Sequence, residues 1–336
     1  MKNATDIVGA IYASYEKQFN AEPFRPHLGA SMGADPCLRK LWYSFRHAKK
    51  VNFEGRILKL FQRGHKEEYV FVDDLNRAGI RVINETLEGE QFRLVCAQNK
   101  HVSGSTDGFA EVLTDAHPSL TMGTTLVCEM KTHGENSFKK LKKENVKNSK
   151  PLHYGQMQIY IKWTRDTWGA DITQALYVAV NKNTDELYIE VIQYDPTYAQ
   201  QIENNMIHVV ESESIPKKLH TDPSRFECKY CDYSDVCHTD TFKLEVNCRT
   251  CIFSKPMADG TWYCKHKDTT IDTTKPCESH VFHQHLLDGF EFREELANDN
   301  YLSYLTKQGE VFENGFGENS FNSTQLAQKI ADGEFA

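Results

Sequence analysis

The stretch LVCEMKTHG, residues 126–134, decides how this chain is interpreted, because it places charged side chains inside an apolar run typical of a β-strand. In a strand, side chains two positions apart point to the same face. The two faces would then carry Leu126, Cys128 and Met130 on one side, and Val127, Glu129 and Lys131 on the other. A surface strand with an ordinary ion pair also fits this pattern, so the rest of the chain has to decide between the two interpretations.

The overall composition is that of a globular protein large enough to bury a substantial core. The chain has 336 residues, of which 40% are hydrophobic and 26% charged. It contains no run of 18 apolar residues, and residues 1–19 have the pattern of an amphipathic helix rather than that of a secretion signal. We therefore expect a cytoplasmic protein, in a bacterial cell or in a host cell if phage-encoded, with no membrane association.

Charge is distributed unevenly along the chain. The net charge is −8, and residues 286–336 carry ten acidic and three basic side chains, which makes this end an acidic tail. The dense basic stretch FKKLKKENVKNSK, residues 138–150, follows the opening motif directly. Its side chains could neutralise DNA phosphates, or could form an ordinary solvated helix face. The candidates for DNA binding are Lys139, Lys140, Lys142 and Lys143.

The order of apolar patterns predicts a mixed α/β core. A helix is expected over residues 53–79, followed by three strands over 91–97, 105–113 and 124–132 that form an antiparallel meander. Two helices should follow, the second beginning at Pro151, and then strands over 174–181 and 186–194. Asp195 and Pro196 should begin a long helix, and in the tail a flexible linker over 313–321 should lead to a terminal helix.

Two carboxylates are expected to meet on the charged face of the opening strand. Asp107 follows a glycine-containing turn at the start of a strand, and pairing of that strand with residues 126–131 would bring Asp107 beside Glu129. Adjacent carboxylates repel unless a hard divalent cation such as Mg²⁺ or Mn²⁺ lies between them. Lys131, on the same face, would add a fixed positive charge and a donor for an attacking water. This combination suits phosphodiester hydrolysis.

Asp107 followed by Glu129-Met130-Lys131 resembles the bipartite signature of the PD-(D/E)XK nuclease superfamily, with Thr106 in place of the nominal proline. Arg63-Gly64-His65 in the preceding helix is similar to the Gly-His motif of the RecB-like branch. Gln156 and Tyr160 in the following helix resemble the Gln-x-x-x-Tyr motif of the same branch.

This resemblance implies a restriction-endonuclease-like nuclease core, with a mixed sheet flanked by helices. It implies that His65, Asp107 and Glu129 bind the metal, with the backbone carbonyl of Met130 as a further ligand. Lys131 would orient or activate the water and stabilise the transition state. Gln156 and Tyr160 would support the lysine or hold the DNA backbone.

Seven of the ten cysteines lie between Cys228 and Cys277, which indicates metal ligands in a reducing compartment. Cys228, Cys231 and Cys237 form a C-x2-C-x5-C pattern that needs a fourth thiolate to hold a [4Fe–4S] cluster. Cys37 is the distant candidate for that ligand, and this layout resembles the iron–sulfur nucleases of the Cas-four-like and AddB-type groups. The alternative fourth ligand is Cys248, which would leave Cys37 as a buried thiol.

A second cysteine group lies beyond the first. Cys248, Cys251, Cys264 and Cys277 have spacings that suit a tetrahedral Zn²⁺ site, which would organise a segment too polar to fold by core burial alone. His280 could replace one of these cysteines. Cys96 and Cys128 are interpreted as core residues.

The carboxylate site predicts a metal-dependent phosphodiester hydrolase, and the resemblance to the RecB-like iron–sulfur nucleases implies a DNA exonuclease acting on ends or single strands in recombination, repair or phage DNA processing. The expected parts are a nuclease core over residues 1–240 closed by an iron–sulfur cluster, a zinc module over 241–285 and the acidic tail over 286–336. The chain contains no GxxxxGK[ST] motif, so a helicase or recombination partner would supply any unwinding. The alternatives are a non-catalytic DNA-binding scaffold stabilised by metals, a structure-specific or sequence-specific endonuclease of the same superfamily, and a redox sensor that uses its cluster.

Overall fold

The computed structural model describes residues 4–295, 301–317 and 320–335. Its largest sheet has five strands in the order β2-β5-β6-β7-β8. Strands β6 and β7 are parallel, and the other neighbours are antiparallel. The bounds are β2 Ile80–Ile83, β5 Gly108–Val112, β6 Thr125–His133, β7 Gln174–Asn181 and β8 Leu187–Gln193. The expected mixed α/β architecture is confirmed.

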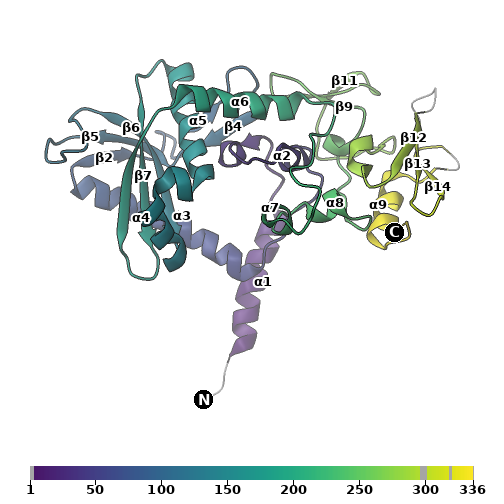
Figure 1. Cartoon of the computed structure of the whole chain (residues 1–336), viewed down its shortest axis with the longest axis horizontal. Helices are drawn as coiled ribbons and strands as arrows, with labels where there is room; N and C mark the ends of the chain where they lie inside the picture. Colours follow the sequence, from purple (N-terminus) through teal and green to yellow (C-terminus); the bar gives the residue numbers. More distant parts are fainter. Residues whose placement is uncertain (1–3, 296–300, 318–319, 336) are drawn as a thin grey trace.

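Strand β6 shows the alternation predicted for its sequence. Leu126, Cys128 and Met130 are buried in a cluster with residues of helix α3 (Gly55–Arg77), whereas Val127 belongs to the larger core that contains helix α5 (Pro151–Trp168). A shift of one residue in register would exchange the two faces and place Lys131 in the apolar cluster, so the register is strongly specified. The parallel crossover from β6 to β7 runs through helices α4 (Glu135–Ser149) and α5 (Figure 1).

A small second sheet, in the order β1-β4-β3, supports the entry to β5. It consists of β1 Leu28–Gly29, β4 Val102–Ser105 and β3 Arg93–Val95. The prediction of a single three-stranded meander was therefore wrong in its first member, because β3 pairs with β4 outside the large sheet. Helix α1 (Thr5–Ala21) extends from the body and packs on α3, and the short 3₁₀ segment η1 spans Ala30–Met32 (Figure 1).

Helix α6 (Pro196–Glu211) packs against α5 and against α2 (Leu38–Phe45), and so joins the large sheet to the cysteine-rich region. Asp195 caps α6 as predicted, since its carboxylate accepts a hydrogen bond of 3.0 Å from the backbone N–H of Tyr198. The cysteine-rich region comprises α7 Phe226–Lys229, α8 Ser234–His238, η2 Cys248–Thr250, β9 Ser254–Pro256, β10 Trp262–Cys264, β11 Thr269–Ile271 and η3 Gln284–Leu287.

The acidic C-terminal segment is folded over most of its length. Strands β12 Glu291–Glu295, β13 Tyr301–Leu305 and β14 Val311–Gly315 form an antiparallel sheet, and helix α9 (Ser323–Ala331) follows. The expected linker over 313–321 was wrong in its first part, because residues 313–315 belong to β14 and Phe312 beside them is buried. The expected terminal helix is confirmed. Among the described residues, no helix is long and apolar enough to cross a membrane.

Candidate active site and metal centres

Asp107 and Glu129 lie side by side because of the register between β5 and β6. Gly108 pairs with Cys128 in antiparallel orientation, which brings the preceding residue opposite Glu129. The Asp107 side chain is fixed by the backbone N–H of Met130, which donates to Oδ2 at 2.7 Å. Thr106, in the position of the nominal proline, donates from its hydroxyl to the carbonyl of Cys128 at 3.2 Å and so ties the two strands together.

Lys131 connects the two carboxylates. Its Nζ lies 2.5 Å from Oε1 of Glu129 and 3.3 Å from Oδ2 of Asp107, and it donates to the carbonyl oxygen of Met130 at 3.0 Å. Burial disfavours the charged amine, but the two carboxylates prevail and raise the pKa of Lys131 above its usual range. Lys131 therefore remains protonated at neutral pH and serves as a positive charge and a donor.

Glu129 is fully buried; its Oε1 contacts Lys131, and its Oε2 has no partner within the described structure. Burial raises the pKa of Glu129 to about 8; Lys131 opposes this shift, and Asp107 adds to it. A buried carboxylate with an unpaired oxygen and a second carboxylate beside it is costly unless a further charge compensates it. An oxygen-preferring divalent cation would supply that charge, so Asp107 and Glu129 fit such an ion.

A third carboxylate, Glu68 of α3, faces the same site and was missed in the sequence. Burial, followed by the charge of Asp107, raises the pKa of Glu68. His65, the predicted metal ligand one helical turn earlier, has a side chain that is 74% exposed, and its Nδ1 lies 3.3 Å from Oε1 of Glu68. The structure therefore places Glu68 between His65 and the carboxylate pair. The spacing of three residues from His65 was the signal available in the sequence.

Gln156 and Tyr160 lie behind the carboxylates. The Tyr160 hydroxyl donates to the carbonyl of Ser105 at 2.7 Å, and the Gln156 amide donates to that hydroxyl at 3.3 Å. A Cβ at Gly104 would lie only 2.8 Å from the Tyr160 hydroxyl oxygen, so the close approach requires glycine there. Both side chains thus hold the segment that leads to Asp107, and no hydrogen bond joins either of them to Lys131 in the described structure.

His133 extends the polar face of β6 beyond Lys131 and was also missed in the sequence. The Tyr177 hydroxyl lies 2.8 Å from Nε2 of His133 and 3.0 Å from Nδ1 of His153. Burial, together with nearby lysines, lowers the pKa of His133 to about 4 and that of His153 to about 3, so both imidazoles are neutral at physiological pH. The alternation that identified Lys131 also places His133 on its face.

The lysines of α4 differ in their surroundings. Lys139 is paired with Glu135 at 2.8 Å, Lys140 with Glu144 at 3.8 Å, and Lys142 with Glu186. Lys143 is exposed and forms no ion pair with any described residue. Of the four candidate DNA contacts, Lys143 is therefore the one whose charge is not already compensated.

Cys37 lies beside the distant cysteine group. It is located immediately before α2, and it lines one small cavity together with Cys228, Cys231 and Cys237. Burial raises the pKa of each of the latter three thiols, and positive charges from Arg39 and Lys40 lie close to the group. Four thiols and two nearby cations fit an anionic iron–sulfur cluster.

The thiols of the second cysteine group lie close enough to influence one another's charge. Cys248 begins η2, Cys251 follows it, and Cys264 ends β10. Burial and the neighbouring thiols Cys277 and Cys264 raise the pKa of Cys248 to about 11, and burial raises that of Cys251 to about 12. His280 is engaged elsewhere, with Nε2 2.9 Å from the carbonyl oxygen of Asn247. Across residues 4–295, 301–317 and 320–335, no three His, Cys, Asp or Glu side chains already stand at the spacing of a single-ion site.

Comparison with known proteins agrees with the geometry of β6. The model of the PD-(D/E)XK nuclease superfamily matches residues 120–238, a segment that contains Glu129, Lys131, Gln156, Tyr160 and Cys228, Cys231 and Cys237. No curated protein matches the chain.

Solved structures that are similar to this chain include an alkaline exonuclease (LHK-Exo) from Laribacter hongkongensis, with 15% identity, a TM-score of 0.36, and coverage of 60% of this chain and 90% of that one. The same exonuclease in complex with dAMP has 14% identity and a TM-score of 0.37, with the same coverage of both chains. The structure of SSO0001 has 13% identity and a TM-score of 0.36, and covers 69% of this chain and 96% of that one. Likeness at this level carries no information on substrate or activity. Over residues 120–238, therefore, the chain is similar to the PD-(D/E)XK nuclease superfamily.

Proposed function

We propose that this protein is a metal-dependent deoxyribonuclease, and that it acts as an exonuclease on DNA ends or single strands. The observation that carries the proposal is the convergence of Asp107 and Lys131 on the buried carboxylate of Glu129, whose Oε2 has no partner in the described structure. A structural ion pair would not need two neighbouring carboxylates, one of them with a pKa raised to about 8. The superfamily match supports hydrolysis of a phosphodiester, and exonuclease action is our extension of it.

In the proposed reaction, Asp107 and Glu129 would hold a Mg²⁺ or Mn²⁺ ion, with Glu68, His65 and the Met130 carbonyl as further candidate ligands. Such an ion would lower the pKa of water and neutralise charge on the phosphate oxygens. Lys131, kept protonated by the carboxylates, orients the attacking water or donates to a non-bridging oxygen. The water loses a proton to solvent as the new P–O bond forms, and the oxygen of the broken P–O bond takes a proton from solvent. Gln156 and Tyr160 keep Asp107 in place from behind.

The other expected parts belong to the same proposal. An iron–sulfur cluster on Cys37, Cys228, Cys231 and Cys237 would join α2 to α7 and α8, and Zn²⁺ on Cys248, Cys251, Cys264 and Cys277 would fix the segment around β9 to β11. DNA would contact α4, chiefly at Lys143. We propose boundaries at residues 240 and 285 for the core, the zinc module and the C-terminal unit.

The test is cleavage of end-labelled single- and double-stranded DNA by anaerobically purified protein with Mg²⁺ or Mn²⁺. We expect stepwise shortening from one end, and a loss of roughly 10²–10³-fold in rate for Lys131→Ala, the order found when one transition-state donor is removed. Lys243→Ala, which removes an exposed lysine outside α4 and outside the carboxylate site, is the matched control and should retain its rate. Equal cleavage by wild type and Lys131→Ala would disprove the assignment. Internal cuts lost in Lys131→Ala would favour the endonuclease, and tight binding without cleavage would favour the scaffold.

A further inference from the structure

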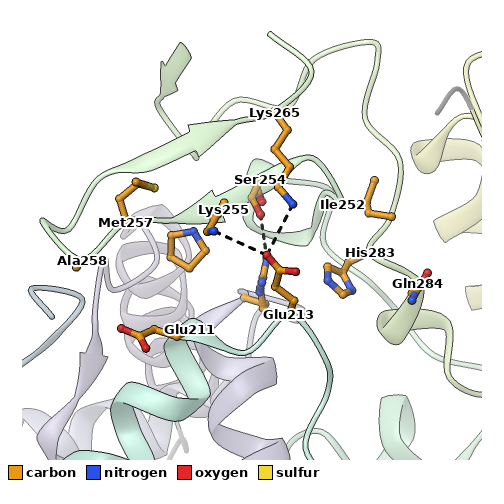
Figure 2. Close-up of a pocket in the computed structure, with 12 residues that line it drawn as sticks. Glu211, Glu213, Ile252, Ser254, Lys255, Met257, Ala258, Lys265, His283 and Gln284 are labelled. Carbon is orange, nitrogen blue, oxygen red and sulfur yellow. Dashed lines mark hydrogen bonds and ion pairs between the residues drawn. The ribbon is translucent and has the colours of Figure 1, made fainter. Parts of the chain in front are cut away.

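A second cavity, of about 550 Å³, lies where the core meets the cysteine-rich segment. It is bounded by the segment that follows α6, by strand β9 and by η3, and none of the carboxylate-site residues line it (Figure 2). Five of its twelve lining residues are charged: Arg46, Lys255 and Lys265 are positive, and Glu211 and Glu213 are negative. A cavity of this size can hold a small molecule or part of a larger one.

Arg46 lines this cavity, and its charge is incompletely compensated. Its residue is 2% exposed, and its guanidinium carbon lies 5.4 Å from the ring centroid of Trp42 and 5.6 Å from that of Trp262. Within the described structure only its Nη1 donates, through long bonds of 3.3 and 3.4 Å to backbone carbonyls, and its buried Nε has no acceptor. Burial lowers the pKa of Arg46 only to about 10, so the charge persists at neutral pH.

A buried arginine usually has a carboxylate partner, because an uncompensated charge in the interior is costly. No described carboxylate oxygen lies within 4.0 Å of Arg46. The nearest candidate is Glu213, whose charge favours the protonated arginine but whose side chain is 70% exposed. The electrostatic requirement of Arg46 is therefore met only in part by the protein itself.

Lys255 and Lys265 converge on the same region from β9 and from the residue after β10. Their Nζ atoms lie 3.9 and 3.7 Å from the same oxygen of Glu213, which is long for an ion pair (Figure 2). Such exposed contacts contribute little to stability. Glu213 thus makes only weak ion pairs with the two lysines, and rotation of its side chain into solvent would free both of them.

We propose that this cavity binds a phosphate group, carried by a nucleotide or by a nucleic-acid strand, on Arg46, Lys255 and Lys265. Arg46 presents a planar fork of donors held between two indole rings, which suits phosphate oxygens, and the two lysines add charge at the rim. Glu213 competes with the ligand for these cations. The inference does not require cleavage at the Asp107–Glu129 site.

The test measures binding of thymidine 5′-monophosphate by calorimetry, and of a 12-nucleotide oligothymidylate by fluorescence anisotropy, with full-length protein and no added divalent cation. Because two charge-assisted hydrogen bonds to the phosphate are lost, the double variant Lys255→Ala/Lys265→Ala should bind roughly tenfold or more weakly. Glu213→Gln should bind more tightly than wild type. The control Lys243→Ala/Lys267→Ala removes two exposed lysines outside the cavity and should bind like wild type.

A response by the mononucleotide alone would support a free-nucleotide site, and a response by the oligonucleotide alone would support a site for backbone phosphate. Equal affinity of wild type and the Lys255/Lys265 variant for both probes would overturn the inference, as would equal weakening in the control. These variants leave Arg46 intact, because its replacement would disrupt the packing of its side chain against Trp42 and Trp262 and would destabilise the fold. Failure of the nuclease proposal would appear as equal cleavage by wild type and Lys131→Ala, and it would leave this binding result unchanged.

Discussion

At the scale of single residues, Glu129 is the most informative side chain in the molecule. It is fully buried beside Asp107, and Lys131 at 2.5 Å only partly compensates its charge. Folding therefore favours the protonated form, which is the reason for its pKa of about 8. A carboxylate held in this way loses its proton readily when a cation binds, so the site is destabilised when empty and favourable when filled.

The first prediction concerns the stability of the metal-free protein. Between about pH 4.5 and pH 8 the folded state retains a proton on Glu129 that the unfolded state has released, so the free energy of unfolding should fall as pH rises through this window. Glu129→Gln removes the titrating group, and at pH 8.5 it should be about 1–3 kcal/mol more stable than wild type. Urea unfolding at pH 5 and pH 8.5 measures this difference. The same pH dependence in both proteins would show that Glu129 is not the group responsible.

The second prediction separates support from catalysis at Tyr160. Tyr160→Phe loses the hydrogen bond to the Ser105 carbonyl, and should reduce the free energy of unfolding by about 0.5–1.5 kcal/mol. Because the hydroxyl does not reach Lys131, the cleavage rate should fall by much less than for Lys131→Ala. Chemical unfolding and single-turnover cleavage of both variants provide the comparison. Equal rate losses would place Tyr160 in direct contact with the substrate.

Much of the carboxylate site could be predicted from the sequence, because alternation along one strand and pairing with the next determine where Asp107, Glu129 and Lys131 lie. The helical contribution was harder to predict. Residues three apart share one helix face, so the Gly-His motif could not determine which of them faces the carboxylates. The motif pointed to His65, whereas Glu68, one turn later, is the side chain whose pKa is raised by Asp107. The role of His65 as a ligand stays a prediction.

At the scale of elements, helix α4 shows that neighbouring carboxylates can compensate the charge of a lysine-rich segment. Its lysines were predicted as a group, but ion pairs with Glu135, Glu144 and Glu186 already compensate three of them. Ion pairs along the helix itself, and with Glu186 just before β8, could not be predicted from the local charge of the run alone. Long, periodic elements such as α3, α5 and α6 were predictable, whereas the three-residue β3 carried no signal of its partner.

The third prediction follows from this difference. Lys143→Ala should weaken DNA binding and reduce the slope of log affinity against log salt by about 1, since one phosphate contact is lost. Lys139→Ala should change the slope less, because its charge is shared with Glu135. Anisotropy titrations over a range of salt concentrations measure both slopes. If the two variants behave alike, α4 binds DNA as an undifferentiated surface or lies outside the interface.

At the scale of the whole molecule, the two cysteine groups join segments that are far apart in the sequence. Cys37 precedes α2, whereas Cys228, Cys231 and Cys237 lie in and around α7 and α8 (Figure 1). All five strands of the large sheet come between these two segments in the sequence. The structure places Cys37, rather than Cys248, in the cavity with Cys228, Cys231 and Cys237. A cluster there would link the chain across the entire core.

The fourth prediction uses this separation. Cys37→Ser should lose iron and labile sulfide while retaining zinc, and its melting temperature should fall because the link between α2 and α8 is gone. Cys248→Ser should show the opposite pattern, with iron retained and zinc lost. Metal analysis of both anaerobically purified variants decides the matter. Iron lost from Cys248→Ser but not from Cys37→Ser would support the rival ligand set.

The C-terminal end shows the limit of sequence reasoning at this scale. Its acidic composition suggested a solvated tail, yet Leu302, Tyr304, Phe312, Leu326 and Ile330 are buried. Each strand is short, and charged residues interrupt the apolar pattern, so the core becomes evident only when three strands and a helix are assembled. Net charge describes the surface of such a unit and not its fold.

The central claim is that Asp107 and Glu129 form a divalent-cation site, and binding of Mn²⁺ followed by electron paramagnetic resonance tests it most directly. Wild type at pH 8 should bind Mn²⁺ at this site, and Glu129→Gln, folded by circular dichroism, should lose that binding while Lys139→Ala retains it. Binding of Mn²⁺ by Glu129→Gln with unchanged affinity and stoichiometry would contradict the account.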